Sequence, residues 1–292
     1  MHNSCTVHKG TRPMILDFHT HLFQPEVIRN REVYFRDPQF KYLYNDSKAR
    51  ILPEEDVYAA MDAAQVDFSV AMGFPWVDEE FCEEQNSFYS SMAKGSGTRI
   101  LPFGSVPLAE NISVERWVRE ISRAGLYGIG EIAFYLYGMT EEYEKYLRSV
   151  LAAACEYSLP VCLHLNEPAG HSYTGKYEPS FSKLYEVISD FPDAAIILAH
   201  WGGGLLFYEL MPEVADCLKN CYYDTAASPY LYENRIFKIA LDIIGPGKIL
   251  FGSDFPLIRQ ERYIDIITKN IPDKKDRDRI LGSNGARILG LE

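Results

Sequence analysis

The sequence lacks the signatures of several large classes of protein. Its first 13 residues hold no apolar run of the kind that forms a secretory signal, and no segment reaches the roughly 20 apolar residues of a membrane span. The six cysteines form no Cys-x-x-Cys pair and no disulfide framework, so we expect reduced thiols. These absences predict a cytoplasmic protein with no membrane partner.

Positive charge is also scarce. The chain has 292 residues, with 29 Lys and Arg against 41 Asp and Glu, and its net charge is −12 without any basic cluster. Such a surface repels polyphosphate, so nucleic acid is not an expected partner. The Gly-x-Gly-x-x-Gly turn of dinucleotide-binding folds is missing after the first apolar run, which disfavours an open doubly wound sheet.

A long alternation of apolar runs and amphipathic helices is present instead. Hydrophobic residues make up 47% of the chain, which is enough for a large core. The apolar runs cover 14–21, 68–73, 100–106, 128–134, 160–165, 194–199, 221–225 and 248–253. Because strands that are apolar throughout are covered on both faces, this series predicts an α/β fold of the (β/α)₈ TIM-barrel type.

Helical patterns fill the intervals between these runs. They cover 53–64, 82–94, 114–124, 141–157, 181–191, 208–219, 234–244 and the tail from 263. We therefore expect one barrel domain over 14–292, after an N-terminal tail over 1–13. An irregular, aromatic-rich inserted loop at about 22–52 is too long for a simple connection, and it is either a lid or a face of a homo-oligomer.

Ionisable residues gather where the predicted strands end, which is the side of a barrel that carries the active site. His19 and His21 are one residue apart on the first strand, so their imidazoles point to the same side. The candidate metal ligands are His19, His21, Glu131, His164, His200 and Asp254. Singly, each could be a packed, paired or capping residue, but together on one face they predict a metal centre.

The chemistry of these side chains fits hydrolysis. Imidazole and carboxylate groups bind Zn²⁺, Mn²⁺ or Fe²⁺, and we expect a divalent metal, with zinc as the first choice. The ligands exceed what one tetrahedral ion needs, which favours two ions bridged by Glu131 and leaves one ion as the alternative. Asp254 and His200 are the predicted catalytic residues, with Asp254 as the proton shuttle for a metal-activated water.

The segment 166–177 follows the fifth predicted strand and is dense in polar and aromatic residues. Its place above the predicted metal centre indicates a loop that binds a small-molecule substrate. The candidate substrate-binding residues are Asn166, His171, Tyr173, Lys176 and Trp201. Each could also be an ordinary solvated or packed side chain.

These motifs resemble those of the amidohydrolase superfamily of metal-dependent barrels. The resemblance covers most of the chain and rests on the sequences DFHTH at 17–21, AHWGG at 199–203 and LFGSDFP at 250–256. The segment AMDAAQVD at 60–67 is similar to the amidohydrolase-related branch. That branch contains hydrolases and enzymes like aminocarboxymuconate-semialdehyde decarboxylase.

Glu131 decides between the activities that this resemblance implies. It stands where binuclear hydrolases often carry a carboxylated lysine, and it is not expected in the decarboxylase-like members. We therefore expect hydrolysis of an amide, ester or lactone bond, with non-oxidative decarboxylation as the alternative. The sequence GIGEI at 128–132 resembles TatD-like deoxyribonucleases, which makes phosphodiester cleavage a third possibility. A binding protein without catalysis would have no reason to retain all six ligands.

Overall fold

The computed structural model describes residues 12–291, so most of the predicted N-terminal tail, with Cys5, lies outside the described residues. Within them the chain forms eight strands. They are β1 (Leu16–His21), β2 (Phe68–Met72), β3 (Ile100–Pro102), β4 (Ile129–Ile132), β5 (Val161–Leu163), β6 (Ile196–Leu198), β7 (Cys221–Asp224) and β8 (Ile249–Leu250). All six ladders between neighbouring strands are parallel, as the apolar runs predicted.

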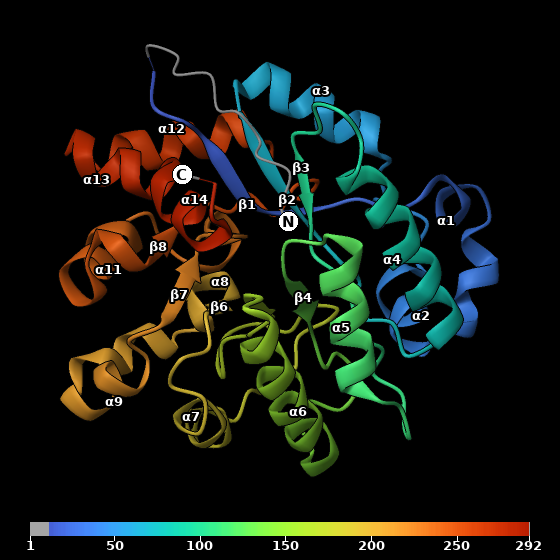
Figure 1. The fold of residues 1–292 in the computed structure, drawn as a ribbon. Coiled ribbons are helices and arrows are strands. Elements are labelled where there is room, and N and C mark those ends of the chain that lie inside the picture. Colours follow the sequence, from blue (N-terminus) through green and yellow to red (C-terminus); the bar gives the residue numbers. More distant parts are fainter. Residues whose placement is uncertain (1–11, 292) are drawn as a thin grey trace.

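The strands follow one another around the molecule in sequence order, and helices surround them (Figure 1). One sheet contains β1 to β3 and the other contains β4 to β8. Single parallel bridges join the two sheets at both seams, between Gly104 and Ile129 and between Thr20 and Phe255. The fold is the predicted α/β barrel, and the carboxyl ends of its strands point to one side.

The predicted burial of the strands is confirmed. Leu16, Phe18, Val70 and Phe103 belong to an apolar cluster with members from six of the strands and the loop after β3, and a larger cluster packs the strands against the helices. This double coverage explains why the strands are apolar throughout.

Most predicted helices are present at close to the expected positions. They are α3 (Glu54–Ala64), α4 (Glu79–Ala93), α5 (Val114–Ala124), α6 (Glu141–Tyr157), α7 (Phe181–Ser189), α11 (Ile236–Ile244) and α12 (Gln260–Asn270). Shorter elements are α8 (Ala199–Gly202), α10 (Ser228–Leu231), η3 (Pro246–Lys248), α13 (Lys274–Asp278), η4 (Arg279–Ser283) and α14 (Asn284–Leu289). No helix among residues 12–291 combines the length and the apolar character that crossing a bilayer requires.

The single helix predicted over 208–219 is wrong. The chain forms η2 (Leu205–Leu210) and then α9 (Pro212–Cys217), with an extended Met211 (φ −89°, ψ 119°) between them. Proline disfavours helical backbone in the residue before it and is well suited to the first turn of a new helix. Pro212 therefore ends one element and begins the next.

The inserted segment after β1 is helical, so the irregular loop expected there is also wrong. It forms α1 (Pro25–Arg29), η1 (Arg31–Arg36) and α2 (Pro38–Tyr44). Asp37 caps α2 by accepting from Gln39 N and Phe40 N, and its other carboxylate oxygen accepts from Val77 N and Asp78 N at 2.6 and 2.9 Å. One buried carboxylate thus fastens the inserted segment to the loop that follows β2.

Candidate metal centre

The first part of the site lies at the seam between β1 and the segment after β8. The Nε2 atoms of His19 and His21 are 3.1 Å apart, and Asp254 Oδ1 lies 3.2 Å from His21 Nε2 and 3.8 Å from His19 Nε2. Asp254 N also donates to His19 O at 2.9 Å, which ties the two segments together. The pairing of β1 with β2 shifts register between Asp17 and Thr20, and bulges of this kind re-aim side chains near functional sites.

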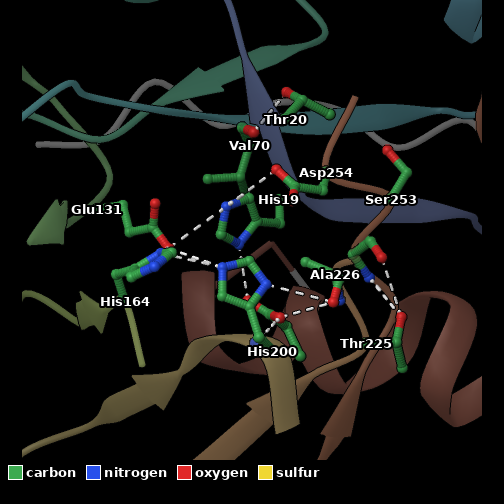
Figure 2. Close-up of polar contacts among 12 residues, drawn as sticks. His19, Thr20, Val70, Glu131, His164, His200, Thr225, Ala226, Ser253 and Asp254 are labelled. Atoms are coloured by element: carbon green, nitrogen blue, oxygen red, sulfur yellow. Dashed lines mark hydrogen bonds and ion pairs between the residues drawn. The ribbon is translucent and has the colours of Figure 1, made fainter. Parts of the chain in front are cut away.

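The second part consists of three side chains from β4 and from the ends of β5 and β6. Glu131 Oε1 lies 2.9 Å from His164 Nδ1 and 3.3 Å from His200 Nε2, and these two nitrogens are 3.1 Å apart. His19 Nε2 lies 3.7 Å from the same oxygen of Glu131, which joins the two parts. Figure 2 shows Glu131 and the imidazoles of His19, His164 and His200 pointing toward one another. The structure thus brings together all six side chains that the strand ends singled out.

Unusual backbone holds two of these residues. His200 and Asp254 have φ angles of 58° and 59°, in the left-handed region that non-glycine residues rarely adopt. Such conformations persist where surrounding contacts enforce them, and they are common at functional sites. The residue before Asp254 is held firmly, because Ser253 N and Ser253 Oγ donate to the carboxylate of Asp17 at 2.9 and 2.5 Å.

The carboxylates and imidazoles hold one another in their charged forms. Burial lowers the pKa of His200, but Glu131 outweighs this effect and raises it to about 9. The pKa of His19 is raised in the same way against burial, mainly by Asp224 and Glu131. Burial raises the pKa of Glu131, and the imidazoles of His164 and His19 bring it well below the usual range. The site therefore favours a positive charge between these side chains.

The donor atoms fit a divalent cation. His19 Nδ1 donates to Asp224 Oδ2 at 2.8 Å and His200 Nδ1 donates to Ala226 O at 3.2 Å, so each neutral ring presents the lone pair of Nε2 to the cluster. Several nitrogen and oxygen lone pairs then face one another, and two groups of three side chains could each hold an ion, namely His19, His21 and Asp254, and His19, Glu131 and His200. His164 differs, because its Nδ1 donates to Glu131 while Asn166 Nδ2 donates to its Nε2 at 3.0 Å.

Cys162 is a buried thiol at the edge of this centre. Its thiol lies beside His19 and Asp224, within the reach of a shared ion. Burial raises the pKa of Cys162 to about 12, so the thiol keeps its proton at neutral pH as long as no ion is bound beside it. Three of the five cysteines among residues 12–291 are buried, as expected of packed thiols, and their reduced state stays a prediction.

A cavity of about 430 Å³ opens onto the metal-binding residues. Of the candidate ligands, His21, Glu131, His164, His200 and Asp254 line it. The walls are mostly aromatic and apolar, formed by Leu43, Tyr44, Phe74, Tyr135 and Tyr173. Lys48 and Arg50 also line the cavity, and both side chains are exposed. This volume and lining suit one small organic molecule.

The predicted substrate-binding residues lie in different places. Tyr173 lines the cavity and accepts from Asn166 Nδ2 at 2.9 Å. His171 and Lys176 are not among its lining residues, and Lys176 Nζ donates to the carbonyl oxygens of Ala169 and His171 within its own loop. Trp201 is buried and donates to Ser228 Oγ. Asn166 is buried and reaches the site through His164 and Tyr173.

Several residues of the site carried no assigned role in the sequence. Asp224 ends β7 as the only acid of an otherwise apolar and aromatic strand, a signal that could have identified it. Lys48, Arg50, Tyr44 and Tyr135 gave no such signal, because their position depends on how the inserted segment and the loop after β4 fold over the barrel.

The comparisons with known proteins agree with the fold and the motifs. The family model described as Amidohydrolase matches residues 16–291. A curated relative, 6-methylsalicylic acid decarboxylase from Penicillium expansum, is 33% identical over 87 residues. That match spans 24% of this chain and only 26% of the relative's own length.

Solved structures similar to this chain include three decarboxylases. 5-Carboxyvanillate decarboxylase from Sphingomonas paucimobilis is 16% identical, with a TM-score of 0.76 over 96% of this chain and 100% of its own. 2,6-Dihydroxybenzoate decarboxylase from Rhizobium is 18% identical, with a TM-score of 0.70 over 96% and 99%. A dihydroxybenzoic acid decarboxylase from a Polaromonas species, solved with manganese and 2-nitroresorcinol, is 16% identical, with a TM-score of 0.69 over 96% and 98%. At these identities the likeness shows the shared fold.

Proposed function

The chain belongs to the amidohydrolase family, and we propose that within this family it is a metal-dependent, non-oxidative decarboxylase of a small aromatic carboxylic acid. This reverses the order of the two activities that the sequence suggested, in which hydrolysis came first. The curated relative with 33% identity and three of the similar structures are all named as decarboxylases of hydroxylated or alkylated benzoic acids.

The observation that carries the proposal is the shape of the site. Five candidate ligands line a cavity whose remaining lining is mostly aromatic or apolar. A flat ring fits between such walls, and its carboxylate would then face the ligands. Lys48 and Arg50 add positive charge to the cavity lining of a chain with net charge −12. These features favour an anionic aromatic substrate.

The reaction needs a proton and no redox partner. The bond between the ring carbon and the carboxylate breaks, CO₂ leaves, and a proton forms the new C–H bond at the same carbon. Asp254 lines the cavity and is the candidate that passes this proton from a solvent molecule to the ring. The pKa of Asp254 is lowered, because the contacts with His21 and His19 outweigh its burial, so Asp254 remains ionised.

The residues that would hold the metal are His19, His21 and Asp254, with Glu131, His164 and His200 beside them. A bound divalent ion supplies positive charge that fixes and polarises the substrate's carboxylate. His21 and Asp254 have 24% and 13% of their side chains exposed, whereas His19 is fully buried. The substrate therefore approaches from the side of His21 and Asp254.

Hydrolysis is the second candidate, and Glu131 favours it. Its carboxylate lies within 3.7 Å of three imidazole nitrogens, where it could bridge two ions as binuclear hydrolysis requires. The choice between the two reactions therefore depends on the number of ions and on the products formed.

An assay of products separates the two reactions. Protein reconstituted with Mn²⁺ or with Zn²⁺ is incubated with 2,6-dihydroxybenzoate, 5-carboxyvanillate and 6-methylsalicylate, and in parallel with simple aryl esters and lactones. The proposal predicts release of CO₂ and formation of the arene lacking that carboxylate from at least one acid. Ester or lactone hydrolysis without CO₂ from any acid would contradict it and favour the hydrolase.

A further inference from the structure

Asp224 is a buried carboxylate that contacts two of the candidate metal-binding residues. It ends β7, is fully buried, and accepts three hydrogen bonds from groups on three segments of the chain. The donors are His19 Nδ1 at 2.8 Å, His200 N at 2.8 Å and Ala226 N at 3.0 Å. A carboxylate with three donors so placed has a fixed orientation.

Its Oδ2 atom determines which nitrogen of His19 carries the proton. An ionised carboxylate only accepts hydrogen bonds, so His19 Nδ1 must be the protonated nitrogen. The lone pair of neutral His19 then lies on Nε2, the atom that faces His21, Glu131 and Asp254. Partners of this kind are known to orient metal-binding histidines and to fix their tautomers.

Its Oδ1 atom acts on His200 through the backbone. It accepts from His200 N, which supports the left-handed conformation of that residue (φ 58°, ψ 48°). It also accepts from Ala226 N, and the carbonyl of Ala226 accepts from His200 Nδ1 at 3.2 Å. The short segment from Asp224 to Ala226 therefore directs the Nε2 atoms of both His19 and His200 into the cluster.

We propose that Asp224 is a positioning residue that prepares His19 and His200 together for metal binding. It touches neither the cavity nor the other candidate ligands, so it acts only through these two histidines. The inference rests on the metal centre proposed above and does not depend on whether the reaction is decarboxylation or hydrolysis.

The variant Asp224→Asn tests this role with little change of shape. The asparagine oxygen can still accept from His200 N and Ala226 N, which turns the amide nitrogen toward His19 Nδ1. Nδ1 must then accept a hydrogen bond, and the proton moves to Nε2, where the ion would bind. We expect the affinity for Mn²⁺ alone, measured by calorimetry, to fall about 10- to 100-fold.

Glu209→Gln is the matched control. Glu209 is also buried and accepts from Tyr223, the neighbour of Asp224 in β7, and it pairs with Lys248 away from the histidines. The control is expected to lower the melting temperature while the folded protein keeps its affinity for Mn²⁺. Asp224→Asn protein that is folded by circular dichroism and binds Mn²⁺ like the wild type would overturn the inference. Wild type that binds no metal would instead overturn the metal centre.

A measurement on the wild type covers the case in which Asp224→Asn does not fold. Long-range ¹H–¹⁵N spectra of Zn²⁺-loaded protein with ¹⁵N-labelled histidine report which ring nitrogen carries the proton. We expect a protonated Nδ1 in both His19 and His200, assigned by the signals missing from His19→Gln and His200→Gln. A protonated Nε2 in His19 would overturn the role of Asp224.

Discussion

Protons and a metal ion compete for the same nitrogen atoms in this centre. The pKa of His19 is raised and that of His200 is about 9, so without a metal both rings hold an extra proton at neutral pH. The pKa values of Glu131 and Asp254 are lowered, so these carboxylates stay ionised and do not compete. Metal binding must therefore release protons from imidazole.

This competition predicts that metal affinity rises with pH. Between about pH 6 and 8 the apparent affinity for Mn²⁺ should increase up to about tenfold per pH unit for each proton displaced. Calorimetry in two buffers with different ionisation enthalpies counts the protons released. An affinity that stays flat over this range, without proton release, would contradict the assigned charge states.

The residues of the metal centre could be predicted from the sequence because they combine two simple patterns. Each lies in the last part of an apolar run or just after one, and parallel strands in a barrel bring their carboxyl ends to one side. The spacing of His19 and His21 also predicted that both rings point to the same side of the strand. The tautomer-setting contacts of Asp224 could not be predicted, because they depend on the backbone turn at His200.

Lys48 and Arg50 give a prediction about substrate affinity. Arg50 donates to the carbonyl of Pro256 at 3.5 Å, and both cations line the cavity. Replacing either by Ala should raise KM for an aromatic acid up to about fivefold and leave kcat nearly unchanged, since exposed ion pairs contribute about 0.2–1 kcal/mol. Lys94→Ala, at the end of α4 and outside the cavity lining, is the control. An unchanged KM in both cavity variants would exclude a role in substrate binding.

Among the elements, the inserted segment departs most from the sequence-based prediction. Its aromatic side chains suggested a lid or an interface, whereas several of them pack on the loop after β2. Phe40 and Trp76 stack with ring centroids 5.1 Å apart, and Tyr44 reaches the cavity from the end of α2. The helices were not predicted because α1 and α2 span five and seven residues, too few for a periodic pattern. The expected homo-oligomer stays a prediction.

Asp37 links this segment to the barrel, and its loss should loosen the cavity wall. Asp37→Ala removes the cap of α2 and leaves the N–H groups of Val77 and Asp78 without their partner. We expect a loss of about 2 kcal/mol or more in the free energy of unfolding, together with faster amide hydrogen exchange over residues 31–50.

The matched control for this element is Asp273→Ala. Asp273 caps α13 in the same way, accepting from Lys275 N and Asp276 N, but it is exposed and far along the chain from the inserted segment. Asp273→Ala should lower the free energy of unfolding by less than Asp37→Ala does, and it should leave amide hydrogen exchange over residues 31–50 unchanged. Equal exchange in both variants would show that Asp37 does not hold the segment in place.

At the scale of the whole molecule, the alternation of strands and helices made the barrel predictable. Errors were confined to places where local chemistry interrupts the alternation, such as Pro212 in the predicted helix over 208–219. The charge of −12 and the missing signal sequence led to the expectation of a cytoplasmic location, which stays a prediction.

Metal binding should stabilise the entire barrel, because the candidate ligands come from five strand ends. At a metal concentration about 100 times the dissociation constant, binding contributes about 2.7 kcal/mol. For a chain of this size, this corresponds to a rise of about 4–5 °C in melting temperature, which a chelator should reverse. The same melting temperature with and without metal would show that the ion does not join these elements.

The metal content of the purified, reconstituted protein tests the account most directly. Elemental analysis of wild type, Glu131→Gln and Asp254→Asn after dialysis with Mn²⁺ or with Zn²⁺ gives the ions bound per chain. We predict at least one ion in the wild type and a clear loss in Asp254→Asn, and a fall from two ions to one in Glu131→Gln would favour the hydrolase over the decarboxylase. Wild-type protein that is folded and binds neither metal would contradict the metal centre, and with it the proposed function.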